Sequence, residues 1–254
     1  MRFLVVKSKS IICAVAVILC AVLLSINFGY GKSASVFFGY APRLVPIYSV
    51  DTLEKKVAIT FDSAWGADKT LKILEILKEY NCNATFFLCG FWVEEYPEMV
   101  EAISNANIEI GTHSNTHADF VKLSQTEMEL ELETSIDLIE KITNKKVELF
   151  RAPYGSYNNK VISTAESFNL KTIQWDVDTL DWKGLTGTEI CSRVVNNVKN
   201  GSIILCHNNS EHILDALPLV LNRLINMGYQ ITSVGDLIIK NDYYVDNLGI
   251  QRKN

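Results

Sequence analysis

Residues 57–88 read VAITFDSAWGADKTLKILEILKEYNCNATFFL, in which two short apolar runs flank a helical pattern. The runs at 57–61 and 84–88 are rich in residues that favour β-strands. Between them, Leu71, Leu74 and Leu77 recur at a spacing that places them on one face of a helix. Strands that alternate with helices in this way indicate a parallel sheet.

The same alternation continues to the end of the chain. Further β-rich runs occur at 107–111, 147–151, 171–176, 202–206 and 230–233, and helical patterns lie between most of them. One of these helices begins with a capping-box pattern at Ser124 and Glu127. In 254 residues, seven such strands predict an α/β fold, a distorted (β/α) barrel of about seven parallel strands. We expect the domain at 53–240, a linker at 33–52 and a C-terminal tail at 241–254.

The N-terminus has a different composition. Arg2, Lys7 and Lys9 precede an apolar run at 11–26, and no charged residue stands between Lys9 and Lys32. This stretch is long enough to cross a bilayer as a helix, and 33–35 is a poor cleavage site. We therefore expect 1–32 to be a signal anchor with the domain outside the cell membrane, or secreted if the signal is cleaved.

The charge of the expected domain argues against nucleic acid as a partner. After residue 32 the chain has 20 Lys plus Arg against 29 Asp plus Glu, a net charge of −9. Four cysteines remain without C-x-x-C spacing, so a zinc knuckle is not indicated. A disulfide between Cys82 and Cys89 stays open. We expect a monomer.

Five polar residues follow or end predicted strands. They are Asp62, His113, Arg151, Asp178 and His207, at strands one, three, four, five and six. In a barrel of parallel strands these positions meet at the carboxyl-terminal rim, where active sites form. The sequence therefore predicts one polar site built from distant parts of the chain.

His113 and His117 stand four positions apart and make up half of the four histidines. On one helical turn both imidazoles would reach a single metal ion. The spacing alone is weak evidence, because ordinary surface or core histidines often show it.

Five blocks of sequence resemble, in order and spacing, the motifs of the NodB-homology polysaccharide deacetylases across about residues 53–240. The blocks are Thr60-Phe61-Asp62-Ser63, His113-Ser114-Asn115-Thr116-His117, Arg151-Ala152-Pro153-Tyr154-Gly155, Asp178-Thr179-Leu180-Asp181-Trp182 and Leu205-Cys206-His207. Five blocks in order are far more specific than any one alone. Behind an N-terminal anchor, the stretch 61–66 resembles the sporulation-associated PdaB-type branch.

The resemblance implies a hydrolase that removes N-acetyl groups from amino sugars of an extracellular glycan. Peptidoglycan is the expected glycan, with N-acetylglucosamine and N-acetylmuramic acid both open. A divalent metal on His113 and His117 would activate water and stabilise the oxyanion. Two imidazoles suit zinc, cobalt or nickel, and zinc is the expected metal.

The resemblance also implies individual roles. Asp62 is the expected general base, and Arg151 pairs with it and keeps it ionised. His207 is the expected general acid that protonates the departing amine, with Asp178 as the carboxylate that holds its imidazole. The simpler alternatives are a structural ion pair for Arg151 and a core histidine for His207.

The remaining motif residues are expected to shape a substrate pocket. Tyr154 would offer its backbone N–H to the oxyanion, and Trp182 and Leu205 would receive the acetyl methyl group. Plain core packing is the alternative for these two side chains. Asp181 is interpreted as a solvated loop acid, and Cys206 as a buried residue on the other face of its strand.

The chain departs from the family pattern at Ser63, where most members have a metal-binding aspartate. A serine is a weak neutral ligand, so the metal would be loosely held unless Asp62 or Asp68 fills the position. Trp65 and Gly66 also replace small residues that are usual in the family. Two hypotheses follow: an active deacetylase, or a degenerate barrel that only binds glycan or a wall-building partner.

Overall fold

The computed structural model describes residues 15–19, 22 and 42–254. The expected anchor at 1–32 lies largely outside these residues. Within them, no helix combines the length and apolar character needed to cross a bilayer. Leu44–Asn254 form one compact unit, which is wider than the predicted domain at 53–240.

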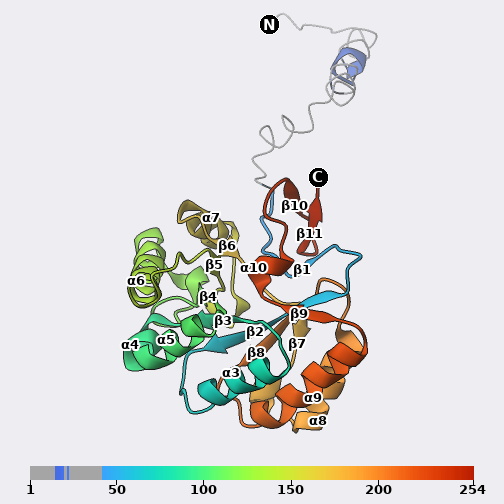
Figure 1. The fold of residues 1–254 in the computed structure, drawn as a ribbon. Helices are drawn as coiled ribbons and strands as arrows, with labels where there is room; N and C mark the ends of the chain where they lie inside the picture. Colours follow the sequence, from blue (N-terminus) through green and yellow to red (C-terminus); the bar gives the residue numbers. More distant parts are fainter. Residues whose placement is uncertain (1–14, 20–21, 23–41) are drawn as a thin grey trace, which may run out of the picture. The chain divides into compact units, whose positions relative to one another are not determined.

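A curled sheet of parallel strands forms the centre of this unit (Figure 1). Its strands are β2 (Lys56–Ser63), β3 (Thr85–Leu88), β4 (Glu109–Thr112), β5 (Leu149–Phe150), β6 (Lys171–Thr172), β7 (Val177–Asp178), β8 (Ile203–His207) and β9 (Gln230–Thr232). Seven of them follow the order β6-β5-β4-β3-β2-β8-β7, and β9 pairs with the first residues of β2. The predicted parallel sheet of about seven strands is confirmed. The predicted strand at 171–176, however, is only the two-residue β6, and a separate strand, β7, begins at Val177.

The sheet curls into a half-barrel because its two outermost strands are neighbours in sequence. β6 and β7 lie at opposite ends of the strand order, yet only residues 173–176 join them. Such a connection spans at most about 18 Å, so the two edges must bend toward each other. Ile47 and Ser49 lie between those edges and form single β-bridges with Ile173 and Ser202.

Helices cover the outer face of the curled sheet (Figure 1). They are α3 (Thr70–Glu79), α4 (Gly90–Glu95), α5 (Pro97–Asn105), α6 (Gln125–Thr143), α7 (Asn159–Ser167), α8 (Gly187–Asn197) and α9 (Ile213–Asn226). The short α10 (Val234–Leu237) follows β9, and its Val234 and Leu237 pack instead in a cluster with Ala58 and Phe87. The predicted capping box at Ser124 and Glu127 opens α6.

Side chains alternate between two apolar clusters, as the pleat of a strand requires. On β2, Val57, Ile59 and Phe61 pack in the larger cluster, which the helices share, whereas Ala58 packs in the smaller one. On β8, Cys206 belongs to the larger cluster, so its predicted place in the core is confirmed. The alternation puts Asp62 on the same side of β2 as Ala58.

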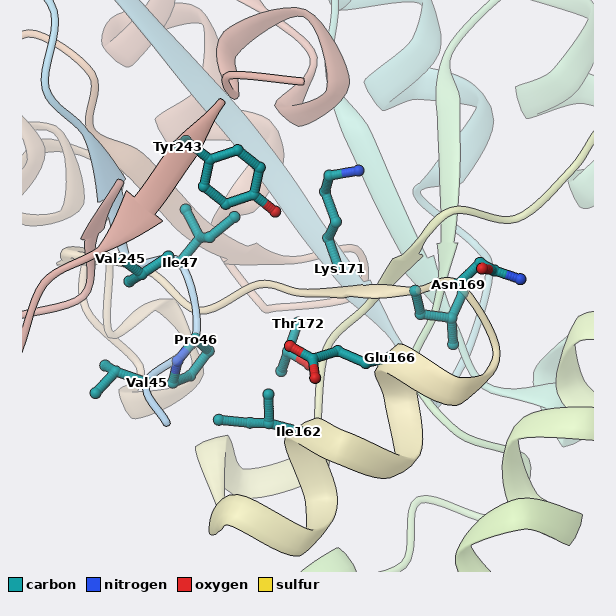
Figure 2. Close-up of a pocket in the computed structure, with 11 residues that line it drawn as sticks. Val45, Pro46, Ile47, Ile162, Glu166, Asn169, Lys171, Thr172, Tyr243 and Val245 are labelled. Carbon is teal, nitrogen blue, oxygen red and sulfur yellow. The ribbon is translucent and has the colours of Figure 1, made fainter. Parts of the chain in front are cut away.

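The residues on both sides of the predicted domain pack against it. β1 (Ser49–Val50), β11 (Ile250–Lys253) and β10 (Tyr243–Val245) form a small second sheet in that order. A cavity of about 250 Å³ lies between the segment 45–47, β10, α7 and β6. Figure 2 shows residues from these four segments around it: Val45, Pro46, Ile47, Ile162, Glu166, Lys171, Thr172, Tyr243 and Val245. Residues from 44 onward and the C-terminal segment are therefore integral parts of the folded unit.

The four cysteines of the compact unit, Cys82, Cys89, Cys191 and Cys206, are all free thiols. The disulfide between Cys82 and Cys89 that the sequence left open is therefore absent from this structure. Burial raises the pKa of the Cys82 thiol to about 11, which makes it a poor nucleophile near neutral pH.

Candidate active site

A cleft of about 710 Å³ gathers residues from the carboxyl ends of the strands. Its walls are formed by Asp62, Ala64, Trp65, His113, His117, Tyr154, Gly155, Trp175, Asp178, Trp182, Leu205, His207, Asn208, Asn209 and Ser210. Asp62 and His207 are register partners on the neighbouring strands β2 and β8. Asp62, His113, Asp178 and His207 thus line one cleft, as the sequence predicts. Arg151 does not line the cleft but is hydrogen-bonded to Asp62.

Asp62 is a buried carboxylate held by Arg151. Its Oδ1 accepts a hydrogen bond from Arg151 Nη1 at 2.7 Å, and its Oδ2 lies 3.6 Å from His113 Nε2. Burial by itself raises the pKa of this carboxyl, but Arg151 and the nearby histidines outweigh it, so the pKa of Asp62 lies below its usual value. Asp62 is therefore ionised at neutral pH, as a general base must be.

Arg151 is completely buried; its two terminal nitrogens are hydrogen-bonded, whereas its Nε has no hydrogen-bond partner. Besides Asp62, it donates to Thr60 Oγ1 at 2.7 Å and to the Gln174 carbonyl at 3.2 Å. Its guanidinium lies 4.1 Å from the ring centroid of Phe87. An arginine packed in this way cannot move easily, so it fixes the orientation of the Asp62 carboxylate.

His113 and His117 lie in a loop after β4 and not on a helical turn, which corrects the prediction made from their spacing. Ser114 and His117 have φ values of 73° and 60°, which a regular helix does not allow. The turn is stabilised by Ser114 Oγ, which accepts the His117 N–H at 3.0 Å. The imidazole centroids are nevertheless 5.0 Å apart, so both rings face the same space.

Both imidazoles are neutral at pH 7. His113 Nδ1 donates to the Arg151 carbonyl at 2.7 Å, which leaves Nε2 as the free nitrogen near Asp62. Burial lowers the pKa of His113. Burial and the neighbouring His113 lower the pKa of His117 to about 4. Neutral imidazoles with a fixed tautomer are suitable metal ligands.

A third protein ligand is not evident in the part of the chain described by the structure. There, no group of three or more His, Cys, Asp or Glu side chains is arranged to hold a metal ion. Ser63 is fully buried, its hydroxyl has no hydrogen-bond partner, and it does not line the cleft. Of the two carboxylates considered as substitutes, Asp62 lies beside His113, whereas Asp68 is exposed and outside the cleft lining.

Asp181 holds the imidazole of His207, and the role given to Asp178 is therefore wrong. His207 Nδ1 lies 2.7 Å from Asp181 Oδ1. Asp178 instead accepts the Leu180 N–H at 2.9 Å, although it still lines the cleft. Burial lowers the pKa of His207, but the hydrogen bond and charge of Asp181 outweigh it, so the pKa of His207 is raised.

The interpretation of Asp181 as a solvated loop acid is wrong, because its side chain is only 1% exposed. Leu180 has a left-handed conformation with φ of 53°, which turns the chain into a short 3-10 helix at Asp181–Lys183. The sequence signal for a second candidate partner of His207 is the presence of two carboxylates, Asp178 and Asp181, in the Asp178–Trp182 block. Nothing in the sequence indicates which of the two faces His207.

Tyr154, Trp182 and Leu205 all line the cleft, as predicted, but they differ in exposure. Leu205 is buried, whereas Tyr154 and Trp182 are 68% and 60% exposed, so these two aromatic rings are not core residues. The Tyr154 ring centroid lies 4.7 Å from that of His117. Tyr154 and Gly155 both have a left-handed backbone conformation, with φ of 61° and 66°.

Comparisons with known proteins agree with this geometry. The family model for polysaccharide deacetylase matches residues 49–173. A peptidoglycan-N-acetylmuramic acid deacetylase, PdaC of Bacillus subtilis, is 34% identical over 74% of this chain and 40% of its own length. A peptidoglycan-N-acetylglucosamine deacetylase of Bacillus cereus is 32% identical over 75% of this chain and 92% of its own length.

Among solved structures, a pseudoenzyme of the CE4 family from Bacillus anthracis superimposes with a TM-score of 0.75. It is 34% identical, and the match covers 85% of this chain and 74% of that one. The chain thus belongs to the polysaccharide deacetylase (CE4) family. It spans less than half the length of the PdaC relative that it matches.

Proposed function

We propose that this protein removes N-acetyl groups from amino sugars of peptidoglycan. The observation that carries the proposal is the pairing of an ionised carboxylate and a carboxylate-held imidazole on adjacent strands, at Asp62 and His207. Hydrolysis of an amide needs a base for water and an acid for the leaving nitrogen, and a protein that only binds glycan needs neither.

The two residues divide the proton transfers between them. Asp62, with its lowered pKa, takes a proton from the attacking water while Arg151 holds its other oxygen. The raised pKa of His207 favours the imidazolium, and Asp181 occupies Nδ1, so Nε2 is the nitrogen left to protonate the departing amine. Arg151 and Asp181 are positioning residues, because each acts through the group that it holds.

The proposed reaction includes a divalent metal, zinc being the expected one. His113 and His117 would hold it, and the buried His117 Nδ1, which has no hydrogen-bond partner, is consistent with a ligand position. When bound, such an ion polarises the amide carbonyl and lowers the pKa of water. With only two imidazoles as evident ligands, we expect the affinity for metal to be weak.

Mass spectrometry of peptidoglycan fragments and chitin oligomers, incubated with zinc-supplemented protein, tests the proposal. The expected result is a product that lacks acetyl groups, together with free acetate. The Asp62→Asn variant serves as the control for contaminating activity. If the parent protein releases no more acetate than this variant from any of the substrates, with zinc, cobalt or nickel, the proposed reaction is wrong.

A second candidate function is a glycan-binding protein without turnover. Ser63 favours it, because this residue offers no carboxylate to a metal, and a structural neighbour is named a pseudoenzyme. Titration calorimetry with the same substrates separates the two functions. Binding without acetate release supports the second, and acetate release excludes it.

We further place the folded domain outside the cell membrane, tethered by 1–32, with a role in sporulation. The basic residues before the apolar run at 11–26 support this orientation. Protease added to intact protoplasts is expected to remove the domain, and protection would contradict the orientation. Spore peptidoglycan from a deletion strain is expected to retain acetyl groups that the parent strain removes.

A further inference from the structure

Trp65 is a large exposed side chain beside the reacting residues, and the proposed chemistry gives it no task. It lies in the loop between β2 and α3, and its side chain is 65% exposed although it lines the same cleft as Asp62 and His207. An exposed aromatic ring that lines a cleft indicates a ligand surface, because covering it removes apolar area from water.

The indole of Trp65 is held on one side only. Its ring centroid lies 4.8 Å from that of His117 and 6.3 Å from that of Phe91, with interplanar angles of 61° and 48°. These contacts fix the ring, while most of its surface stays open. A ring that is already fixed loses little conformational entropy when a ligand packs on it.

The backbone that follows Trp65 is also fixed relative to the expected catalytic acid. The Gly66 carbonyl accepts hydrogen bonds from Trp92 Nε1 at 2.8 Å and from Asn208 Nδ2 at 2.9 Å. Asn208 follows His207 directly, so a short path of covalent and hydrogen bonds connects Trp65 to the acid. The backbone next to Trp65 therefore has a defined position relative to His207.

The rest of the cleft indicates which ligand would cover this ring. Trp65 and Tyr154 lie on the His117 side, and Trp182 adjoins Asp181 on the His207 side, so exposed rings stand on both sides of the reacting centre. The described residues that line the cleft include no lysine or arginine. Lys183 Nζ lies 4.9 Å from the Trp182 ring centroid, so the rings without a basic group among the cleft-lining residues are those of Trp65 and Tyr154. Such aromatic faces suit the C–H faces of uncharged sugar rings, and not a polyanion.

We infer that Trp65 forms a sugar-stacking subsite that binds the ring next to the reacting sugar of a polymeric glycan. The inference rests on the proposed function for its substrate class, but it concerns binding and does not require turnover. It makes chain length a determinant of affinity, because a single sugar in the reacting position leaves Trp65 uncovered.

Titration calorimetry with N-acetylglucosamine, its tetramer and a peptide-free peptidoglycan tetrasaccharide tests the inference. The parent is compared with Trp65→Ala, Trp65→Phe and Tyr244→Ala, the last being a control at an exposed aromatic residue on β10, outside the cleft lining. We expect Trp65→Ala to weaken tetrasaccharide binding about tenfold. Trp65→Phe should retain most of the affinity that Trp65→Ala loses. Trp65→Ala should bind the single sugar as the parent does, and Tyr244→Ala should bind all three ligands as the parent does.

Equal affinity of the parent and Trp65→Ala for both tetrasaccharides would overturn the inference, as would a parent protein that binds neither of them. Acetate release, measured separately, reports on the proposed function. Binding that depends on Trp65 without acetate release supports the subsite and rejects the reaction. Acetate release with no effect of Trp65→Ala on affinity retains the reaction and rejects the subsite.

Discussion

The Asp181 carboxylate holds His207 at two points, accepting its ring Nδ1–H at 2.7 Å and its backbone N–H at 2.8 Å. A third hydrogen bond, from Ser210 Oγ at 3.0 Å, reaches the same carboxylate. Because Asp181 is buried, these contacts leave it no freedom to turn. The imidazole is therefore fixed in orientation and tautomer before a substrate binds.

Asp181→Asn is expected to lower kcat at least about tenfold and to move the alkaline limb of the pH profile toward lower pH. His207 must be protonated to act as the acid, and its raised pKa keeps it protonated to a higher pH than an unperturbed histidine. Without the carboxylate that raises this pKa, protonation is lost earlier as the pH rises. The measurement is acetate release as a function of pH.

Asp178→Asn is the matched control for this prediction, because Asp178 lines the cleft without touching the His207 imidazole. The charge of Asp178 also raises the pKa of His207, but by less than Asp181 does, so the alkaline limb of Asp178→Asn should move less than that of Asp181→Asn. If Asp178→Asn moves the limb and Asp181→Asn does not, the assignment of the positioning carboxylate is wrong.

Asp62→Asn is expected to reduce activity by about 10²–10⁴-fold, since the amide cannot accept the proton from water. The variant is nearly isosteric but should not be neutral for stability. It removes the charge that compensates the fully buried Arg151, and breaking such a pair costs about 3–5 kcal/mol. Denaturant unfolding, followed by circular dichroism, measures this loss.

The double variant Asp62→Asn with Arg151→Met serves as the stability control. It removes the buried cation together with its partner, so part of the lost stability should return while activity stays absent. The losses in free energy of unfolding are compared for Asp62→Asn, Arg151→Met and the double variant. A loss in the double variant that exceeds the sum of the two single losses would contradict the buried-pair explanation.

Ser63→Asp is expected to raise zinc affinity by about 10- to 100-fold if position 63 can supply the third ligand. The Ser63 hydroxyl is buried without a partner, so a carboxylate there would be an uncompensated charge in the absence of metal. The metal-free variant should therefore be less stable than the parent, and zinc should restore its melting temperature.

Calorimetry with zinc and thermal unfolding with and without zinc measure both effects. Equal zinc affinity in the parent and Ser63→Asp would show that position 63 is not the missing ligand position. Asp62, 3.6 Å from His113 Nε2, would then be the remaining candidate.

Lys69→Met is expected to reduce both stability and activity modestly. Lys69 Nζ donates to the carbonyls of Asn209, Ser210 and Glu211 at 3.4, 2.6 and 3.1 Å, in the loop that follows His207. Loss of these partly exposed bonds should cost about 1 kcal/mol. Lys72→Met, which removes only an exposed pair with Glu75, should leave activity and stability unchanged.

The arrangement of the site could be predicted wherever it depends on strand periodicity. Asp62 and His207 end buried strands of a parallel sheet, and such positions must meet at one rim. The same two-residue period correctly placed Cys206 in the core. These predictions need only the pattern of apolar residues and the direction of the strands.

Predictions failed where backbone conformation departs from a regular period. The left-handed Leu180 turns the Asp181 side chain inward, and positive φ at Ser114 and His117 brings the two imidazoles together without a helix. β6 and β7 have two residues each, too few for a pattern to separate them. Local side-chain hydrogen bonds and tertiary packing determine such turns, and neither is visible in composition or spacing.

The four residues that join β6 to β7 close the half-barrel and also help to hold Arg151, the partner of the proposed general base Asp62. Within this connection, the Gln174 carbonyl accepts a hydrogen bond from Arg151, and the Trp175 ring lies 5.5 Å from the same guanidinium. If the two edges of the sheet separate, Arg151 loses these contacts and Asp62 loses its anchor. Loss of activity in denaturant should therefore coincide with separation of β6 from β7. It should occur even while the outer helices remain folded.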